Sequence, residues 1–321
     1  MAGYACNRCG HIVDIPSPEC LCATRIPDLR PAADVGSVHE KVYTDIASDD
    51  LESGMQPEQE KNQRADFDLS RLTKVLPPRS KLRILEIGPG DGVLSRKLAV
   101  HHELYVMDIT DEYIRRFDFV TGAFVADIET MPFVEEFDHI ILCDVLEHVL
   151  NEGDALLSVR RALRPSGTIY IRCPSNEPSV AYARTLGSPY PYVHLRSYST
   201  GTLERAATAA GISVSECRYV RLSPAGYARR DFGIAALRNA RAKRYVIDLF
   251  RAHRGLTGVP PINKVDWFVG ELESMTWRVG NRVSRRATKA ILQRVWYRPS
   301  EVYMIGRKLP FEFDDQSSTI I

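Results

Sequence analysis

The sequence has no long hydrophobic run, no evident internal repeat and almost no net charge. None of its apolar stretches approaches the roughly 18 residues that a membrane-spanning helix needs. The N-terminus also lacks the basic-then-apolar order of a secretory signal, so we expect a cytoplasmic protein. The 321 residues are 44% hydrophobic and 26% charged, with a net charge of +1. This composition predicts a globular protein with one core and some additions.

Cysteine is scarce beyond the first 22 residues. Three cysteines lie on or beside predicted strands, where a free thiol acts as a small apolar filler: Cys143, Cys173 and Cys217. The other four form two N-terminal pairs: Cys6, Cys9, Cys20 and Cys22. In a reducing compartment these four favour a structural zinc–thiolate site over disulfides. The Cys-x-Cys spacing of the second pair is unusual, and His11 is an alternative ligand, so the ligand set stays open.

A glycine-rich turn is the most informative segment of the chain. The apolar run 82–87 predicts a buried strand, residues 93–100 predict a helix, and Gly88, Gly90 and Gly92 lie between them. Glycines let a ligand approach the main chain, and the amide groups at the start of a helix face that ligand. The turn therefore predicts a nucleotide-like cofactor, although its Gly-x-Gly-x-Gly spacing differs from the dinucleotide fingerprint.

Three further apolar runs each lead into a polar side chain. These runs cover residues 104–107, 123–126 and 139–143. Asp108 follows the first run, about twenty residues after the glycine turn. At this spacing a carboxylate can accept hydrogen bonds from ribose hydroxyls. Asp127 and Ile128 follow the second run and suit the amino group and the ring of adenine. Because parallel strands end at one edge of a sheet, the sequence predicts a doubly wound α/β fold with its site at that edge.

These residues resemble those of class I S-adenosylmethionine-dependent methyltransferases. The segment 146–149, LEHV, resembles the matching sequence in the branch of this family that contains ubiquinone-biosynthesis and sugar O-methyltransferases. The resemblance covers roughly 82–219 and the strand at 302–306, and it implies a seven-stranded sheet with an antiparallel last strand. It also implies a set of cofactor-binding residues: Glu86, Gly88, Gly90, Asp108, Ile109, Asp127, Ile128, Cys143 and Asp144. The alternative is an α/β domain that binds no cofactor.

Two histidines near the expected mouth of the site are candidates for acceptor chemistry. Methyl transfer is an in-line displacement, and an alcohol acceptor needs a base. Imidazole titrates near neutral pH, so His148 is our first candidate base and His194 the second. On a predicted helix, Asp144, Glu147 and His148 would share one face and, with His194, hold a divalent cation. This set resembles the metal site of small-RNA 2′-O-methyltransferases. The alternative is that these residues cap and pack a helix or fix a loop.

The segments around this core differ in charge. We divide the chain into six segments. The first three are a zinc-ribbon-like segment (1–27), an acidic linker with a covering helix (28–78) and a cofactor-binding core (79–222). The last three are a basic helical insertion (223–300), a last core strand (301–309) and a tail (310–321). The covering helix is expected at 60–75, and Tyr43 upstream either packs or faces the sulfonium. Residues 221–300 contain 17 Lys and Arg against 5 Asp and Glu, including a basic amphipathic helix at 274–297. This insertion suits anionic lipid, a phosphate-bearing acceptor, RNA, the acidic remainder of the chain, or a second subunit in a homodimer.

The combined expectation is a methyltransferase that uses S-adenosylmethionine to O-methylate a small molecule. The acceptor would be a hydroxyl on a sugar, a natural product or a lipid-linked intermediate. A metal-dependent RNA 2′-O-methyltransferase and a non-catalytic binding scaffold are the alternatives. The chain has no recognisable RNA-binding module, which disfavours the RNA enzyme. The complete glycine turn with its two carboxylates disfavours the non-catalytic scaffold.

Overall fold

The computed structural model of the protein describes six stretches of the chain: residues 3–15, 18–48, 58–76, 81–175, 194–222 and 298–309. The basic helical insertion at 223–300 lies outside these stretches except for its last three residues. Its amphipathic helix and its expected contacts with lipid, RNA or a second subunit therefore lie outside the described residues, as does the tail at 310–321.

One seven-stranded sheet forms the centre of the molecule, in the order β5-β4-β3-β6-β7-β9-β8. Its five parallel strands are β3 (Arg83–Ile87), β4 (Glu103–Asp108), β5 (Gly122–Val125), β6 (Phe137–Cys143) and β7 (Leu163–Pro174). The last strand, β9 (Arg298–Lys308), pairs antiparallel with both β7 and β8 (Ile212–Leu222). This arrangement confirms the predicted doubly wound α/β sheet and its antiparallel last strand.

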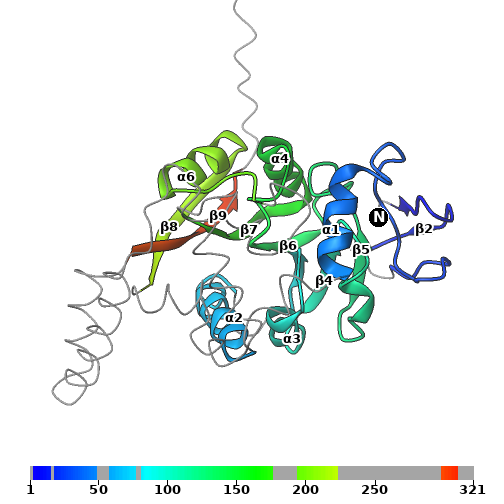
Figure 1. Ribbon diagram of the computed structural model, residues 1–321, viewed down its shortest axis with the longest axis horizontal. Helices are drawn as coiled ribbons and strands as arrows, with labels where there is room; N and C mark the ends of the chain where they lie inside the picture. The colour runs from blue at the N-terminus through cyan, green and yellow to red at the C-terminus, as the bar shows by residue number, and fades with distance from the viewer. Residues whose placement is uncertain are drawn as a thin grey trace, which may run out of the picture.

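Helices cover both faces of this sheet. In Figure 1, α2 (Glu58–Leu72) and α3 (Val93–Ala99) lie on one face, and α4 (Glu152–Ala162) and α6 (Thr200–Ala209) lie on the other. Neighbouring strand residues such as Ile84 and Leu85 are buried on opposite faces, in two separate apolar clusters. Parallel strands covered on both sides read as continuous apolar runs, and the sequence patterns of β3 and β6 follow this rule.

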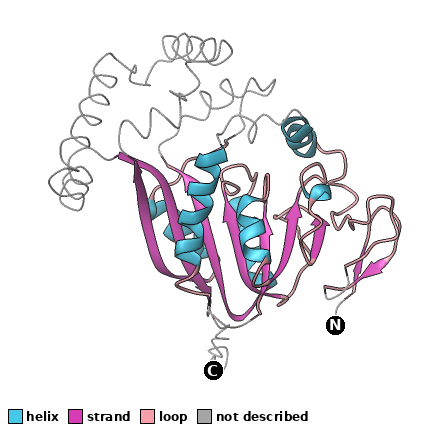
Figure 2. Cartoon of the chain, turned by 90° about the horizontal axis from the view of Figure 1, so that it is seen from below, coloured by secondary structure: helices cyan, strands magenta, loops and turns pink. Residues whose placement is uncertain are grey.

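The N-terminal segment lies at the β5 edge of the sheet. It contains a small hairpin of β1 (Tyr4–Ala5) and β2 (Ile12–Val13), which Figure 2 shows beyond the edge of the sheet that β5 forms. Asp28 then runs alongside Val125 of β5, and the Leu29 N–H donates to the Val125 carbonyl at 2.8 Å. The segment is thus attached to the edge of the sheet by main-chain hydrogen bonds.

Two local expectations differ from the structure. Part of the predicted acidic linker is a helix, α1 (Val38–Ser48), and a 3-10 turn η1 (Ile114–Arg116) follows β4. Residues 144–150, where the sequence predicts the start of a helix, form a turn instead, because Asp144 adopts a left-handed conformation with φ of 57°.

None of the helices within the described residues has both the length and the apolar character to cross a bilayer.

Candidate functional site

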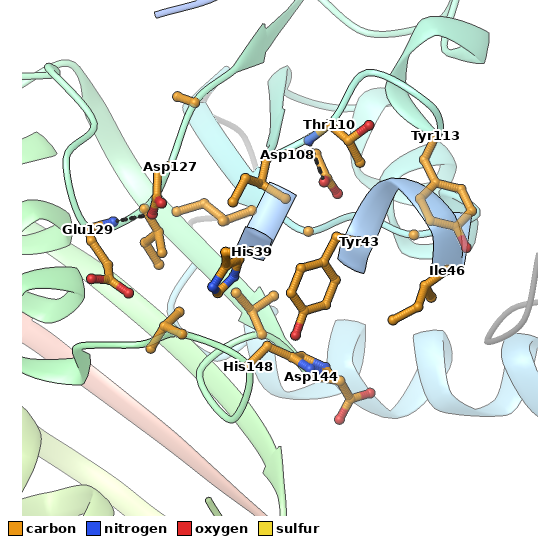
Figure 3. Close-up of a pocket in the computed structure, with 18 residues that line it drawn as sticks. His39, Tyr43, Ile46, Asp108, Thr110, Tyr113, Asp127, Glu129, Asp144 and His148 are labelled. Carbon is orange, nitrogen blue, oxygen red and sulfur yellow. Dashed lines mark hydrogen bonds between the residues drawn. The ribbon is translucent and has the colours of Figure 1, made fainter. Parts of the chain in front are cut away.

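A pocket opens where β3, β4, β5 and β6 reach their carboxyl ends, and helix α1 crosses above it (Figure 3). Its lining includes seven of the nine predicted cofactor residues: Gly88, Gly90, Asp108, Ile109, Asp127, Ile128 and Asp144. His148, the first candidate base, lines the same pocket. Residues from four separate strand ends therefore meet in one place, as expected for parallel strands.

The glycine turn after β3 leaves room for a ligand. Gly88 has φ of +63°, and a Cβ atom there would lie 2.6 Å from Cγ2 of Val145, so a larger residue does not fit. Gly90 also has a positive φ, +54°, but a Cβ atom there would meet no atom within 4 Å. Only glycine adopts this conformation freely, and the space above Gly90 is open to an occupant.

Two carboxylates are held at the pocket wall by local hydrogen bonds. Asp108 accepts from the backbone N–H of Thr110 at 3.2 Å, and Asp127 accepts from that of Glu129 at 2.9 Å. In both cases the partner lies two residues further along the chain, so the loop conformation itself orients the acid. Carboxylates oriented in this way suit hydroxyl and amino groups of a nucleoside.

Helix α1 supplies a wall that the sequence analysis missed apart from Tyr43. His39, Tyr43 and Ile46 all line the pocket. The ring centroids of His39 and Tyr43 lie 5.0 Å apart, and those of Tyr43 and His148 lie 5.4 Å apart, edge to face. Positions 39, 43 and 46 have the i, i+4, i+7 spacing of one helix face, which is the signal that could have identified this helix.

Glu147, His148 and His194 form a buried group beside the pocket. Their potential ligand atoms all lie within 4.8 Å of one another, and the two imidazole centroids are 4.6 Å apart. The turn at 144–150 makes this possible, because the Leu195 N–H donates to the Glu147 carbonyl at 2.8 Å and fixes His194 against the turn. The predicted helical face is therefore replaced by a turn that brings three of the four expected residues together.

Asp144, the fourth expected residue, is engaged elsewhere. Its carboxylate pairs with Arg172 at 2.9 Å and with Arg64 at 2.6 Å, and it lies outside the group of potential metal ligands. Arg172 is buried and also pairs with Asp68 and Glu301. Asp144 thus lines the pocket as part of an ion-pair network and does not join the histidines.

Two of the predicted cofactor residues do not line the described pocket. Glu86 lies beneath the glycine turn, where its carboxylate accepts from the Ser95 hydroxyl at 2.6 Å. Burial raises the pKa of Glu86 to about 8, although the bond from Ser95 acts in the opposite direction. The Cys143 thiol lies 3.8 Å from Asp68, and burial raises its pKa well above the usual value. Both residues therefore contact other buried side chains and do not line the pocket.

The four N-terminal cysteines are gathered at one point. All four sulfur atoms lie within 4.8 Å of one another, with Cys20 at 3.3 Å from Cys9 and 3.1 Å from Cys22. Zinc–sulfur bonds of about 2.3 Å in a tetrahedron require sulfur separations of this order. Burial raises the pKa of the Cys6 thiol, but hydrogen bonds, among them one from the Asp28 N–H, lower it to about 7. His11 is not part of this group. The cluster therefore fits a zinc ion.

Comparison with known proteins identifies the family of the central segment. Residues 60–216 match the model of a family described as a methyltransferase domain. No curated protein matches the chain. Similar solved structures include the YcgJ protein of Bacillus subtilis (15% identity, TM-score 0.47, covering 77% of this chain and 100% of that chain). They also include Haemonchus contortus phosphoethanolamine N-methyltransferase 2 with S-adenosyl-L-methionine (15% identity, TM-score 0.46, covering 76% of this chain and 53% of that chain). A third is the N-methyltransferase NodS of Bradyrhizobium japonicum with S-adenosyl-L-homocysteine (15% identity, TM-score 0.45, covering 85% of this chain and 98% of that chain).

Proposed function

Because residues 60–216 match the model of a methyltransferase-domain family, we propose that this chain transfers a methyl group from S-adenosylmethionine to a hydroxyl of a small molecule. The expected acceptor is a sugar, a natural product or a lipid-linked intermediate. One observation carries this proposal. A single pocket has the glycine turn, Asp108 and Asp127 on one side and the imidazole of His148 on the other.

S-Adenosylmethionine, when bound, supplies a methyl group on a positively charged sulfonium. The open space at Gly90 would receive the part of the cofactor that passes closest to the main chain. Asp108 would accept hydrogen bonds from the ribose, and Asp127 with Ile128 would hold the adenine. Asp144, whose carboxylate pairs with Arg64 and Arg172, would lie beside the sulfonium at the pocket wall.

His148 would bind the acceptor and take its proton. A hydroxyl oxygen is a weak nucleophile until a base removes its proton, and an imidazole serves well near neutral pH. His194 contacts the His148 ring edge to face and holds it in place, and Tyr43 makes a second edge-to-face contact with that ring. Helix α1, which carries Tyr43, covers the pocket and helps to exclude water.

The grouping of Glu147, His148 and His194 favours a second candidate function, metal-dependent 2′-O-methylation of RNA. One carboxylate and two imidazoles suit a divalent cation, which would lower the pKa of the acceptor hydroxyl and orient it. A chelator distinguishes the two chemistries. Activity that is lost with a chelator and restored by Mg²⁺ or Mn²⁺, together with salt-sensitive RNA binding, would replace the small-molecule proposal.

We further propose that Cys6, Cys9, Cys20 and Cys22 bind a structural zinc ion. The segment around them is too short to bury a core of its own, and a metal would fix it. No open position for a substrate is needed when four thiolates complete the tetrahedron. Metal analysis tests this assignment, because a protein with both Cys6→Ser and Cys9→Ser should lose its zinc.

Calorimetric titration with S-adenosylmethionine tests the proposed function. The wild type should bind the cofactor, and Asp108→Ala should weaken binding about 10- to 100-fold, because hydrogen bonds to charged groups contribute ~1.5–3 kcal/mol. Asp118→Ala is the matched control, since Asp118 is exposed on the same segment and does not line the pocket. A wild type that does not bind the cofactor would overturn the proposal. Mass-shift screening of hydroxyl compounds for a methyl increment would then identify the acceptor.

A further inference from the structure

One buried arginine joins the N-terminal segment to two walls of the pocket. The Arg30 side chain is only 2% exposed. Its Nε and Nη2 atoms bind the two carboxylate oxygens of Asp28 at 2.9 and 2.7 Å. Its Nη1 atom donates to the carbonyl of Ile109 at 3.1 Å and lies 2.7 Å from the carboxylate of Glu40. A single guanidinium thus contacts three separate segments of the chain.

Two of these segments form the pocket. Ile109 lines it, between Asp108 and Thr110 in the loop after β4. Glu40 lies on α1, beside His39 and one turn before Tyr43, which line the opposite wall. A displacement of Arg30 would therefore release the proposed ribose loop and helix α1 together.

The third segment leads to the cysteine cluster. The Asp28 N–H donates to the sulfur of Cys6 at 3.4 Å, and the Asp28 carbonyl accepts from the Asn7 N–H at 2.6 Å. On its other side, this strand-like segment is bonded to Val125 of β5, directly before the pocket residues Ala126 and Asp127. The position of Asp28 thus depends on the loop that carries Cys6, and Arg30 depends on Asp28.

We propose that Arg30 is a positioning residue that links the cysteine cluster to the cofactor pocket, so that zinc in the cluster strengthens the binding of S-adenosylmethionine. This inference rests on the proposed function, because it requires the cofactor to bind this pocket. Coupling between two binding sites is reciprocal. Bound cofactor therefore strengthens the binding of zinc by the same factor.

Arginine is needed here for its geometry as well as its charge. A planar guanidinium binds both oxygens of a carboxylate and a carbonyl at once, whereas the ammonium of lysine does not. Asp28 is 1% exposed, and its other charged partner, Arg8, is 33% exposed and also pairs with Asp111. Surface pairs of this kind contribute little, so we expect Arg8→Ala to have a much smaller effect than Arg30→Lys.

The test measures cofactor affinity of the full chain by calorimetry, with zinc loaded and after chelation. In the wild type, zinc removal should weaken the binding of S-adenosylmethionine about tenfold, within the usual range of coupling. Arg30→Lys should weaken binding to the loaded protein by a similar factor and should abolish most of the response to zinc. Saturating cofactor should also slow the release of zinc to a chromophoric chelator in the wild type, and not in Arg30→Lys.

Arg160→Lys is the matched control. Arg160 is another buried arginine that joins distant segments, with hydrogen bonds to the carbonyls of Gly211 and Leu309, but it does not contact the pocket. Its substitution should lower the melting temperature and leave cofactor affinity and the response to zinc unchanged. Glu40→Gln provides a second variant, which weakens the contact of Arg30 with α1 and keeps its contacts with Asp28 and Ile109.

The outcomes separate the two proposals. A wild type that fails to bind S-adenosylmethionine refutes the proposed function, and the coupling with it. A wild type that binds the cofactor equally with and without zinc, or that takes up no zinc, refutes the coupling alone. Full coupling in Arg30→Lys, or an equal loss of affinity in Arg160→Lys, shows that Arg30 has no specific part in it.

Discussion

The two sides of the pocket are built in different ways. We call Gly88, Gly90, Asp108 and Asp127 the glycine side, and Tyr43, Asp144, Glu147, His148 and His194 the histidine side. On the glycine side, each acid is oriented by a backbone N–H two residues further along the chain. On the histidine side, Asp144 pairs with Arg64, which also binds Glu301, 237 positions further along the sequence. One side is local in the sequence, and the other is assembled by tertiary packing.

This difference indicates how each side tolerates change. A local turn is oriented mainly by its own few residues, with Arg30 as the one distant contact named above for the loop after Asp108. An assembled wall depends on every element that it joins, and on the pairing of the charges buried between them. The substitutions below test this comparison.

Replacing His148 should have the largest effect. If the histidine side performs the chemistry and the glycine side only binds the cofactor, His148→Gln should lower the rate of methyl transfer about 10²- to 10⁴-fold. The affinity for S-adenosylmethionine should change little. Rates with the acceptor found by mass-shift screening, together with calorimetry, measure both quantities.

The two histidines also allow a control. His194→Gln should lower the rate less than His148→Gln, because His194 does not line the pocket and acts by holding the neighbouring ring. Equal losses of cofactor affinity and rate in His148→Gln would contradict the division into two sides.

The same division explains which features could be predicted from the sequence. The strands, the glycine turn, Asp108 and Asp127 follow from short apolar runs and from the residues directly after them. Helix α1 was missed because only Ile46 and Ala47 of its eleven residues are buried, which leaves a weak apolar pattern in an acidic segment. The covering helix α2 ends at Leu72, slightly before the expected end.

The histidine side was only partly predictable. The residue types and their approximate position were identifiable, but the left-handed conformation of Asp144 that turns the chain away from a helix has no local sequence signal. The pairing of Asp144 with Arg64 and Arg172 was not predicted either, because those residues lie on α2 and β7. The burial of Arg172 and its pairing with three acids depend on the assembled sheet.

Removing Arg172 should produce the second-largest effect, a loss of stability. Its side chain is 5% exposed and pairs with Asp68, Asp144 and Glu301. Arg172→Met would leave buried acids without this partner, and breaking a buried pair in this way costs about 3–5 kcal/mol. Urea unfolding of the whole chain measures the change in the free energy of unfolding.

Arg164→Met on the same strand is the matched control. Arg164 pairs with Asp138, and its side chain is 35% exposed, so its loss should cost less than ~1 kcal/mol. Equal effects of the two substitutions would show that buried charge pairing does not hold the histidine side together.

Replacing Glu86 should produce the smallest effect, a change in the pH dependence of stability. Burial raises the pKa of this carboxyl from 4.5 to about 8 in the folded protein, with Asp68 and Asp91 adding to the effect. The folded state therefore holds a proton that the unfolded state releases at a lower pH. This contribution to stability is complete below about pH 4.5 and is lost as the pH rises through about 8. Between pH 7 and pH 8 the free energy of unfolding should fall by roughly 1 kcal/mol from this group.

Glu86→Gln should remove that slope, because an amide beneath the glycine turn has no proton to lose. Ser95→Ala should keep the slope and shift it along the pH scale. The Ser95 hydroxyl donates to Glu86 and lowers its pKa, so without this hydrogen bond the loss of stability should shift to higher pH. Urea unfolding at several pH values distinguishes the three proteins. If Glu86→Gln kept the slope of the wild type, no protonated acid would lie beneath the glycine turn, and the pH dependence would come from other groups.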